Sequence, residues 1–118
     1  MWQLDFYETD SGRCPVLDFI SALNQKVEAP YIEKSLEMLK NDGNRLDYPH
    51  VKYLEDGIYE LRIQTSGGRF RFLYFFYMKT SIIVTNGFRK KNREVKRHYI
   101  DLAKSYRKIY IERKSNES

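Results

Sequence analysis

The sequence predicts an α+β domain in which helices pack on one face of a curled antiparallel sheet of four to five strands. Two observations carry this prediction. Alternating apolar and polar residues, the period of a half-buried strand, recur in the second half of the chain between short turns. Apolar residues spaced by three and four, the period of a helix, precede these strands and return at the C-terminus.

The first half of the chain is expected to hold one strand and a helical hairpin. Residues 2–6 alternate as a strand does, and the turn cluster TDSGR follows. Pro15 is typical of the first position of a helix. A second helix is expected from about Pro30 to Asn41, because Gly43 then takes the place of a C-terminal cap.

The second half is expected to hold three or four adjacent strands and a final helix. The strand candidates VKYL, IYELRIQ, RFRFLYFFYM and SIIVTNGF are separated by the turns EDG, TSGG and KT. Strands joined by such short turns must be antiparallel. An amphipathic helix is expected from about Asn92 to Arg113, with a frayed tail at 114–118. The predicted order is β-α-α-β-β-β-(β)-α within a single domain of residues 1–118.

Composition narrows the range of partners. The 118 residues carry a net charge of +5, which favours nucleic acid, another anionic surface or an acidic protein as partner. The single Cys14 excludes a disulfide within the chain, and His50 and His98 lack the spacing of metal ligands, so no metal or cofactor is expected. No run approaches the ~18 apolar residues of a membrane span. No secretion signal is evident, so we expect a cytoplasmic protein without a membrane partner.

Basic residues are expected to gather on one face of the sheet. Arg62 lies on the polar side of its strand, and Arg69 and Arg71 lie on the polar side of the next strand. The TSGG turn makes these strands neighbours, so Arg62 and Arg71 can lie side by side although like charges repel. The basic residues 89–91 follow the last strand and border the same face. Such a surface suits a phosphate backbone, and the alternative is a solvated outer face.

Other candidate groups give weaker signals. Lys52 lies on a strand that can border the basic face, which makes it a candidate phosphate contact. His98 and His50 are candidate proton carriers, with an ordinary surface histidine as the alternative for each. Glu60 can act as a base or form an ion pair with Arg62. The sequence has neither GxxxxGK nor GxGxxG, so the known phosphate cradles are absent.

The run YELRIQTSGGRFRFLYFF, followed by NGFRKKNREVKRHYIDLA, resembles the HigB-like, phage-derived branch of the RelE/ParE toxin superfamily. The similarity covers residues 49–104 and includes the stretches 49–54, 57–62, 71–76 and 87–91. The N-terminal strand and helical hairpin agree with this family in order and length. The resemblance therefore implies a RelE-like fold for the whole domain.

The resemblance also implies a function. It points to the toxin of a type II toxin–antitoxin pair, a ribosome-dependent mRNA endonuclease (mRNA interferase) that works without a metal. In such enzymes the 2′-hydroxyl of the RNA attacks the adjacent phosphate. The implied partners are mRNA, the ribosome and a cognate antitoxin, expected to be a helix-turn-helix protein of the HigA kind. Catalysis is expected from Arg62, Arg71, Lys90 and Lys91. RNA binding is expected from Lys52, Arg69, Phe88 and Arg89.

Two other functions share this fold and stay open. One is a ParE-like toxin that inhibits gyrase without cutting RNA, and the other is a non-catalytic module that binds RNA or an antitoxin. The KK pair after GF, together with Arg62 and Arg71 on one face, favours the endonuclease. Because Arg71 is expected on an exposed face, its replacement by alanine is predicted to abolish toxicity without unfolding the protein.

Overall fold

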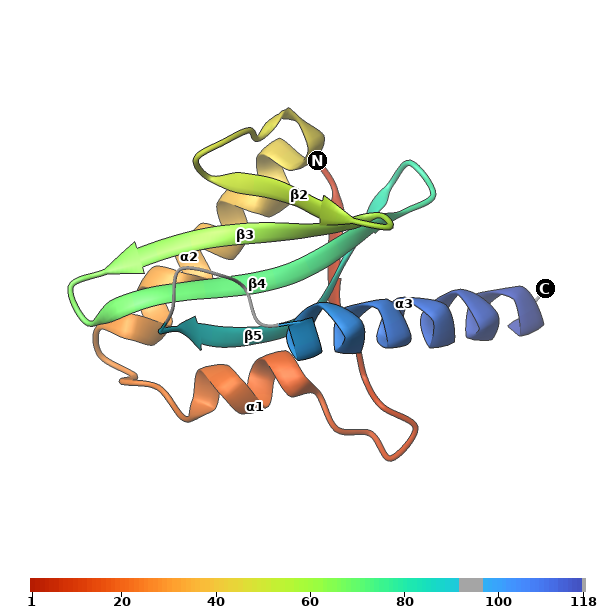
Figure 1. The fold of residues 1–118 in the computed structure, drawn as a ribbon, viewed down its shortest axis with the longest axis horizontal. Coiled ribbons are helices and arrows are strands. Elements are labelled where there is room, and N and C mark those ends of the chain that lie inside the picture. Colours follow the sequence, from red (N-terminus) through yellow and green to blue (C-terminus); the bar gives the residue numbers. More distant parts are fainter. Residues whose placement is uncertain (92–96, 118) are drawn as a thin grey trace.

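The structure is a computed structural model, and it describes residues 1–91 and 97–117 (Figure 1). The described strands are β1 (Gln3–Phe6), β2 (Val51–Glu55), β3 (Ile58–Thr65), β4 (Gly68–Tyr77) and β5 (Ser81–Lys90). The described helices are α1 (Pro15–Ser21), α2 (Glu28–Asp42), the 3-10 turn η1 (Gly43–Arg45) and α3 (Arg97–Glu117). The predicted α+β class and the predicted order of elements are confirmed, including the fourth consecutive strand.

Some boundaries differ from the prediction. α2 begins at Glu28, before the expected Pro30. β5 continues past Phe88 to Lys90, because the basic residues that end it still pair with β4. α3 reaches Glu117, so the tail expected at 114–117 is helical. The first turn of the helix expected from Asn92 lies outside the described residues.

The five strands form one mixed sheet in the order β1-β5-β4-β3-β2. The pairs from β2 to β5 are antiparallel hairpin neighbours, as predicted. β1 instead pairs with β5 in parallel, from Gln3 opposite Ser81 to Phe6 opposite Val84. The sheet is therefore not purely antiparallel. The sequence pattern of β1 shows that it is a strand but carries no information about the edge it joins.

Helices cover both faces of the sheet, whereas the sequence led us to expect them on one face. Figure 1 shows α2 passing behind the strands, where Ile32, Leu36 and Leu39 join a core with Phe70 and Phe72. On the other face, Ile100 and Ala103 of α3 join a second core with Leu73, Phe75 and Ile83. The cause lies in β4, whose run FRFLYF at residues 70–75 is buried on both faces. A strand covered on both faces reads as a continuous apolar run.

Ion pairs hold α3 against the rest of the chain at both ends. Near its start, Arg97 Nη2 lies 2.6 Å from Glu55 Oε2, and Lys104 Nζ lies 3.0 Å from the same oxygen. Near its end, Arg113 Nη2 lies 2.6 Å from Asp10 Oδ1. Glu55 therefore joins the β2–β3 turn to two residues of the helix that lie about two turns apart.

We expect acid to weaken this attachment of α3. The hydrogen bonds from Arg97 and Lys104 lower the pKa of Glu55 to about 2 from an ordinary 4.5. A carboxyl group with a lowered pKa in the folded state stabilises the protein above its unfolded pKa, and that stability is lost as the pH falls through the folded pKa. Between pH 4.5 and 2, the urea midpoint should therefore fall more steeply for the unmodified chain than for Glu55→Gln. Parallel curves for the two proteins would show that Glu55 does not contribute.

Candidate functional site

The basic residues meet at the end of the sheet where the β3–β4 hairpin turns. In the cross-strand register, Arg62 on β3 lies opposite Arg71 on β4, and Arg69 on β4 lies opposite Lys90 on β5. Side chains alternate along a strand, so these residues share one face of the sheet. It is the face that α3 covers farther along the strands. We call Arg62, Arg69, Arg71 and Lys90 the basic cluster. The predicted juxtaposition of Arg62 and Arg71 is confirmed by this register.

Arg71 is buried, which corrects the expectation that it lies on an exposed face. Its residue is 3% exposed, because β4 is an inner strand flanked by β3 and β5. Its Nη1 donates a hydrogen bond to the carbonyl oxygen of Phe70 at 2.9 Å. Burial lowers the pKa of Arg71, Glu60 opposes that shift, and the charge of Arg62 adds to it. Replacing Arg71 must therefore be expected to affect stability as well as function.

Glu60 supplies the negative charge beneath the cluster. It is 1% exposed, and its Oε1 lies 3.5 Å from Arg62 Nη1 and 3.7 Å from Arg71 Nε. The sequence suggested two roles for Glu60, a base or an ion-pair partner of Arg62, and the structure shows the ion pair. Within the described residues, neither carboxylate oxygen of Glu60 accepts a hydrogen bond. The carboxylate is thus held by charge alone, which explains how two arginines can lie side by side.

Lys90 stands out among the lysines of the site. It is half-buried at the end of β5. Burial, and then the charge of Arg71, lower the pKa of Lys90, so its ammonium group gives up a proton more readily than an exposed lysine. Lys91 follows β5 and is exposed. Lys52 is also exposed, and its register position opposite Glu60 places it on the same face as the basic cluster.

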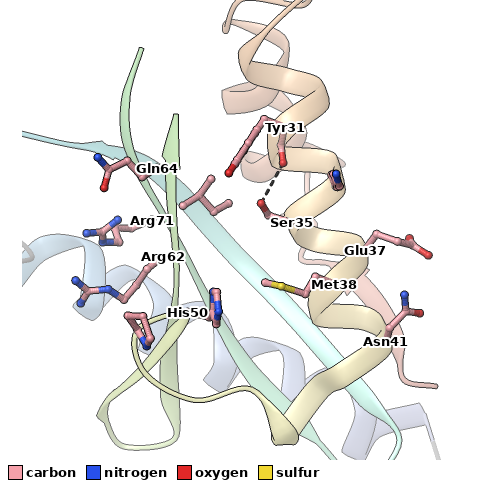
Figure 2. Close-up of a pocket in the computed structure, with 12 residues that line it drawn as sticks. Tyr31, Ser35, Glu37, Met38, Asn41, His50, Arg62, Gln64 and Arg71 are labelled. Atoms are coloured by element: carbon pink, nitrogen blue, oxygen red, sulfur yellow. Dashed lines mark hydrogen bonds between the residues drawn. The ribbon is translucent and has the colours of Figure 1, made fainter. Parts of the chain in front are cut away.

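A groove of about 750 Å³ opens between α2 and β3, beside the cluster. It is lined by Tyr31, Met38, His50, Arg62, Ile63 and Arg71, among others. Figure 2 shows Arg62, Gln64 and Arg71 pointing away from α2, whereas His50 and Met38 lie between the strands and the helix. The backbone N–H of Arg62 donates to the carbonyl oxygen of His50 at 2.8 Å. This bond fixes the backbone of His50 relative to the cluster.

Two residues expected to bind RNA make contacts within the protein. Phe88 is 4% exposed and stacks on Tyr99 of α3 with 3.9 Å between ring centroids, so that face of its ring is taken. Arg89 points to the opposite face of the sheet from Lys90, as alternation requires. There its Nη2 lies 3.1 Å from Glu28 Oε2, and its guanidinium lies 4.6 Å from the ring centroid of Phe70. Both residues therefore stabilise the fold. Arg69, in contrast, is exposed within the cluster.

The two histidines differ in their surroundings. His50 lines the groove together with Arg62 and Arg71. His98 is exposed at the start of α3, where its ring centroid lies 4.0 Å from that of Tyr99. No pattern in the sequence favours His50 over His98, because the position of His50 depends on how the loop after α2 returns to the sheet.

Residues 1–91 and 97–117 lack two further features. No group of three or more His, Cys, Asp or Glu side chains is placed to hold a metal ion there. No helix in this part of the chain combines the length and the apolar character needed to cross a bilayer.

Comparison with known protein families finds one whose sequence model matches most of the chain. The sequence model of the family described as "Phage derived protein Gp49-like (DUF891)" matches residues 18–108, from α1 into α3. That span is more than half of the chain and contains every residue of the basic cluster. None of the curated proteins compared with the chain matches it. The chain therefore belongs to the Gp49-like family of phage-derived proteins, within the RelE/ParE-like toxin superfamily.

Proposed function

We propose that this protein is the toxin of a type II toxin–antitoxin pair and that it cleaves mRNA on the ribosome, as a member of the HigB-like branch. Membership of the Gp49-like family suggests a toxin with an antitoxin partner. The observation that carries the endonuclease proposal is the basic cluster beside an open groove. Paired arginines with one buried counter-charge, and a lysine with a lowered pKa, are suited to phosphoryl transfer.

In this proposal the arginines bind the scissile phosphate. Arg62 is partly exposed, with 23% of its side chain accessible, and makes the direct bidentate contact. Arg71 lies behind it and acts mainly through its charge, which is more effective in a buried position than in water. Together they stabilise the negative charge that develops on the phosphorus as it becomes five-coordinate. Lys52, Arg69 and Lys91 contact neighbouring phosphates along the RNA.

The reaction needs one proton transfer at the attacking 2′-oxygen and another at the leaving 5′-oxygen. The 2′-oxygen forms a bond to phosphorus while the bond from phosphorus to the 5′-oxygen breaks. His50, in the groove beside Arg62, accepts the proton of the 2′-hydroxyl. Lys90, whose pKa is lowered, donates a proton to the leaving 5′-oxygen. The products are a 2′,3′-cyclic phosphate and a 5′-hydroxyl end.

Induction of the protein in a bacterial host, followed by mapping of RNA 5′ ends, tests this function. We expect growth arrest and new 5′-hydroxyl ends within translated codons. Arg62→Ala should remove the new ends, because it deletes the accessible phosphate contact. Arg45→Ala is the matched control, since Arg45 is an exposed arginine that forms an ion pair with Asp42, away from the cluster.

The alternative functions give different results in the same experiment. Intact mRNA with damaged DNA would indicate a gyrase inhibitor of the ParE kind and reject the endonuclease. Growth arrest with intact mRNA and intact DNA would indicate a binding module without catalysis.

A further inference from the structure

β3 is longer than the strand that pairs with its outer edge. The register of β2 with β3 ends at Val51 opposite Leu61, whereas β3 continues to Thr65. Figure 1 shows β3 and β4 extending past the start of β2. In the part of the chain that the structure describes, the bond from Arg62 N–H to the carbonyl oxygen of His50 is the last backbone hydrogen bond on this side. The outer edge of residues 62–65 is therefore not covered by β2.

The backbone groups on this edge can be assigned from the ladder. In an antiparallel strand, the N–H and C=O of every second residue point to the same side. Because the N–H of Arg62 points to the outer side, the N–H and C=O of Gln64 point there as well. Upstream of β2 the chain turns away, since His50 N–H and Val51 N–H both donate to the carbonyl oxygen of Asp47. Within the described residues, nothing continues the line of β2 along Gln64.

The two sides of this edge differ in chemistry. On the side of α2 lies the groove, with Tyr31, 50% exposed, and Met38 facing the strands. On the other side lie Arg62 and Arg71 of the basic cluster. An added strand would send alternate side chains to these two sides. A segment that matches both would alternate apolar and acidic residues.

We propose that this edge binds an extended segment of the antitoxin by strand addition, with apolar side chains in the groove and acidic side chains on the basic cluster. Backbone hydrogen bonds to Gln64 supply affinity, and the two sets of side chains supply specificity. Charge favours acidic side chains in the bound segment, because the chain carries a net charge of +5. In the basic cluster, Arg62 and Arg71 share the single carboxylate of Glu60 as ion-pair partner. Given the proposed function, the acidic side chains would take the place of the scissile phosphate and inhibit the toxin.

Binding of a synthetic peptide tests the strand addition without RNA. The probe is a fluorescent eight-residue peptide that alternates Leu and Glu, and binding is measured by fluorescence anisotropy. Residues with opposite side-chain directions also point their N–H groups to opposite edges. In an added strand, either the Leu residues or the Glu residues therefore point their N–H groups at β3. N-methylation of that class should weaken binding by about tenfold or more, and N-methylation of the other class should have little effect. Equal effects from both methylated peptides would overturn the strand addition, and so would unchanged binding when Glu is replaced by Lys.

Two variants of the protein test the same edge. Gln64→Pro removes the outward N–H, which an edge strand tolerates, and should weaken peptide binding by about tenfold or more. Gln64→Ala keeps that N–H and should bind as the unmodified chain does. Circular dichroism and thermal unfolding check that both variants are folded. If Gln64→Pro does not fold, the methylated peptides still decide the question.

The remaining outcomes separate this inference from the proposed function. Peptide binding without any RNA cleavage by the protein would support the edge and reject the endonuclease. If a single-stranded RNA oligonucleotide binds with the same sensitivity to Gln64→Pro while the peptide does not bind, the edge is an RNA subsite and the inference is wrong. Concentration-dependent dimerisation that Gln64→Pro abolishes would likewise reject it in favour of a second copy of the chain.

Discussion

Replacing Arg71 by alanine is expected to lower the free energy of unfolding by about 3–5 kcal/mol, as for other broken buried ion pairs. The reason is Glu60, which is 1% exposed and has the guanidinium groups of Arg62 and Arg71 at 3.5 and 3.7 Å as ion-pair partners. Without Arg71, the carboxylate of Glu60 stays buried and retains the ion pair with Arg62. Urea unfolding at neutral pH measures the change. The sequence predicted that Arg71→Ala leaves the fold intact, whereas the burial of Arg71 predicts a large loss of stability.

A second substitution separates the loss of stability from the loss of function. In the double variant Glu60→Gln/Arg71→Ala, both charges of the pair are gone, so the destabilisation should be smaller than the sum of the two single effects. In the double variant, RNA cleavage should stay about 10²–10³-fold slower than in the unmodified protein, because the phosphate still lacks the preorganised cation of Arg71. Recovery of cleavage together with stability would mean that Arg71 has only a structural role. Equal stability of Arg71→Ala and the unmodified protein would mean that Glu60 does not depend on it.

The part of this site that the sequence could predict depends on local pattern. The TSGG turn fixes β3 and β4 as neighbours, and alternation then brings Arg62 and Arg71 together. The same alternation should have separated Arg89 from Lys90, but the strand was expected to end at Phe88. The prediction therefore groups the two residues in one basic run, whereas β5 includes both and points them to opposite faces.

The rest of the site depends on contacts between segments that are distant in sequence. Phe88 was expected to stack on RNA, but it stacks on Tyr99, which α3 brings over that face. Glu60 on β3 and Arg71 on β4 are buried because both strands lie inside the sheet and helices pack on both of its faces. The groove exists because α2 runs beside a part of β3 that β2 does not reach. None of these arrangements has a period or a motif in the sequence.

Removal of the imidazole of His50 is expected to slow RNA cleavage by about 10²–10⁴-fold, the usual contribution of a general base. His50 lines the groove to which Arg62 and Arg71 also contribute, and the proposed function places the reacting RNA at this position. In His50→Ala the backbone carbonyl that accepts the Arg62 N–H is retained. Because the side chain is exposed, stability should change little. Single-turnover cleavage of ribosome-bound mRNA measures the rate, and cosedimentation with ribosomes checks that binding is unchanged.

His98→Ala is the matched control for this prediction. It also removes an exposed imidazole, but one that contacts Tyr99 at the start of α3 rather than lining the groove. We expect this variant to cleave at nearly the unmodified rate, so the ratio of the two rates reports the position of the histidine and not the loss of a histidine as such. A slow His98→Ala beside a fully active His50→Ala would move the base to the α3 side of the cluster. If both variants are fully active, neither histidine takes the proton, and Lys90 becomes the residue of the cluster whose lowered pKa suits proton transfer.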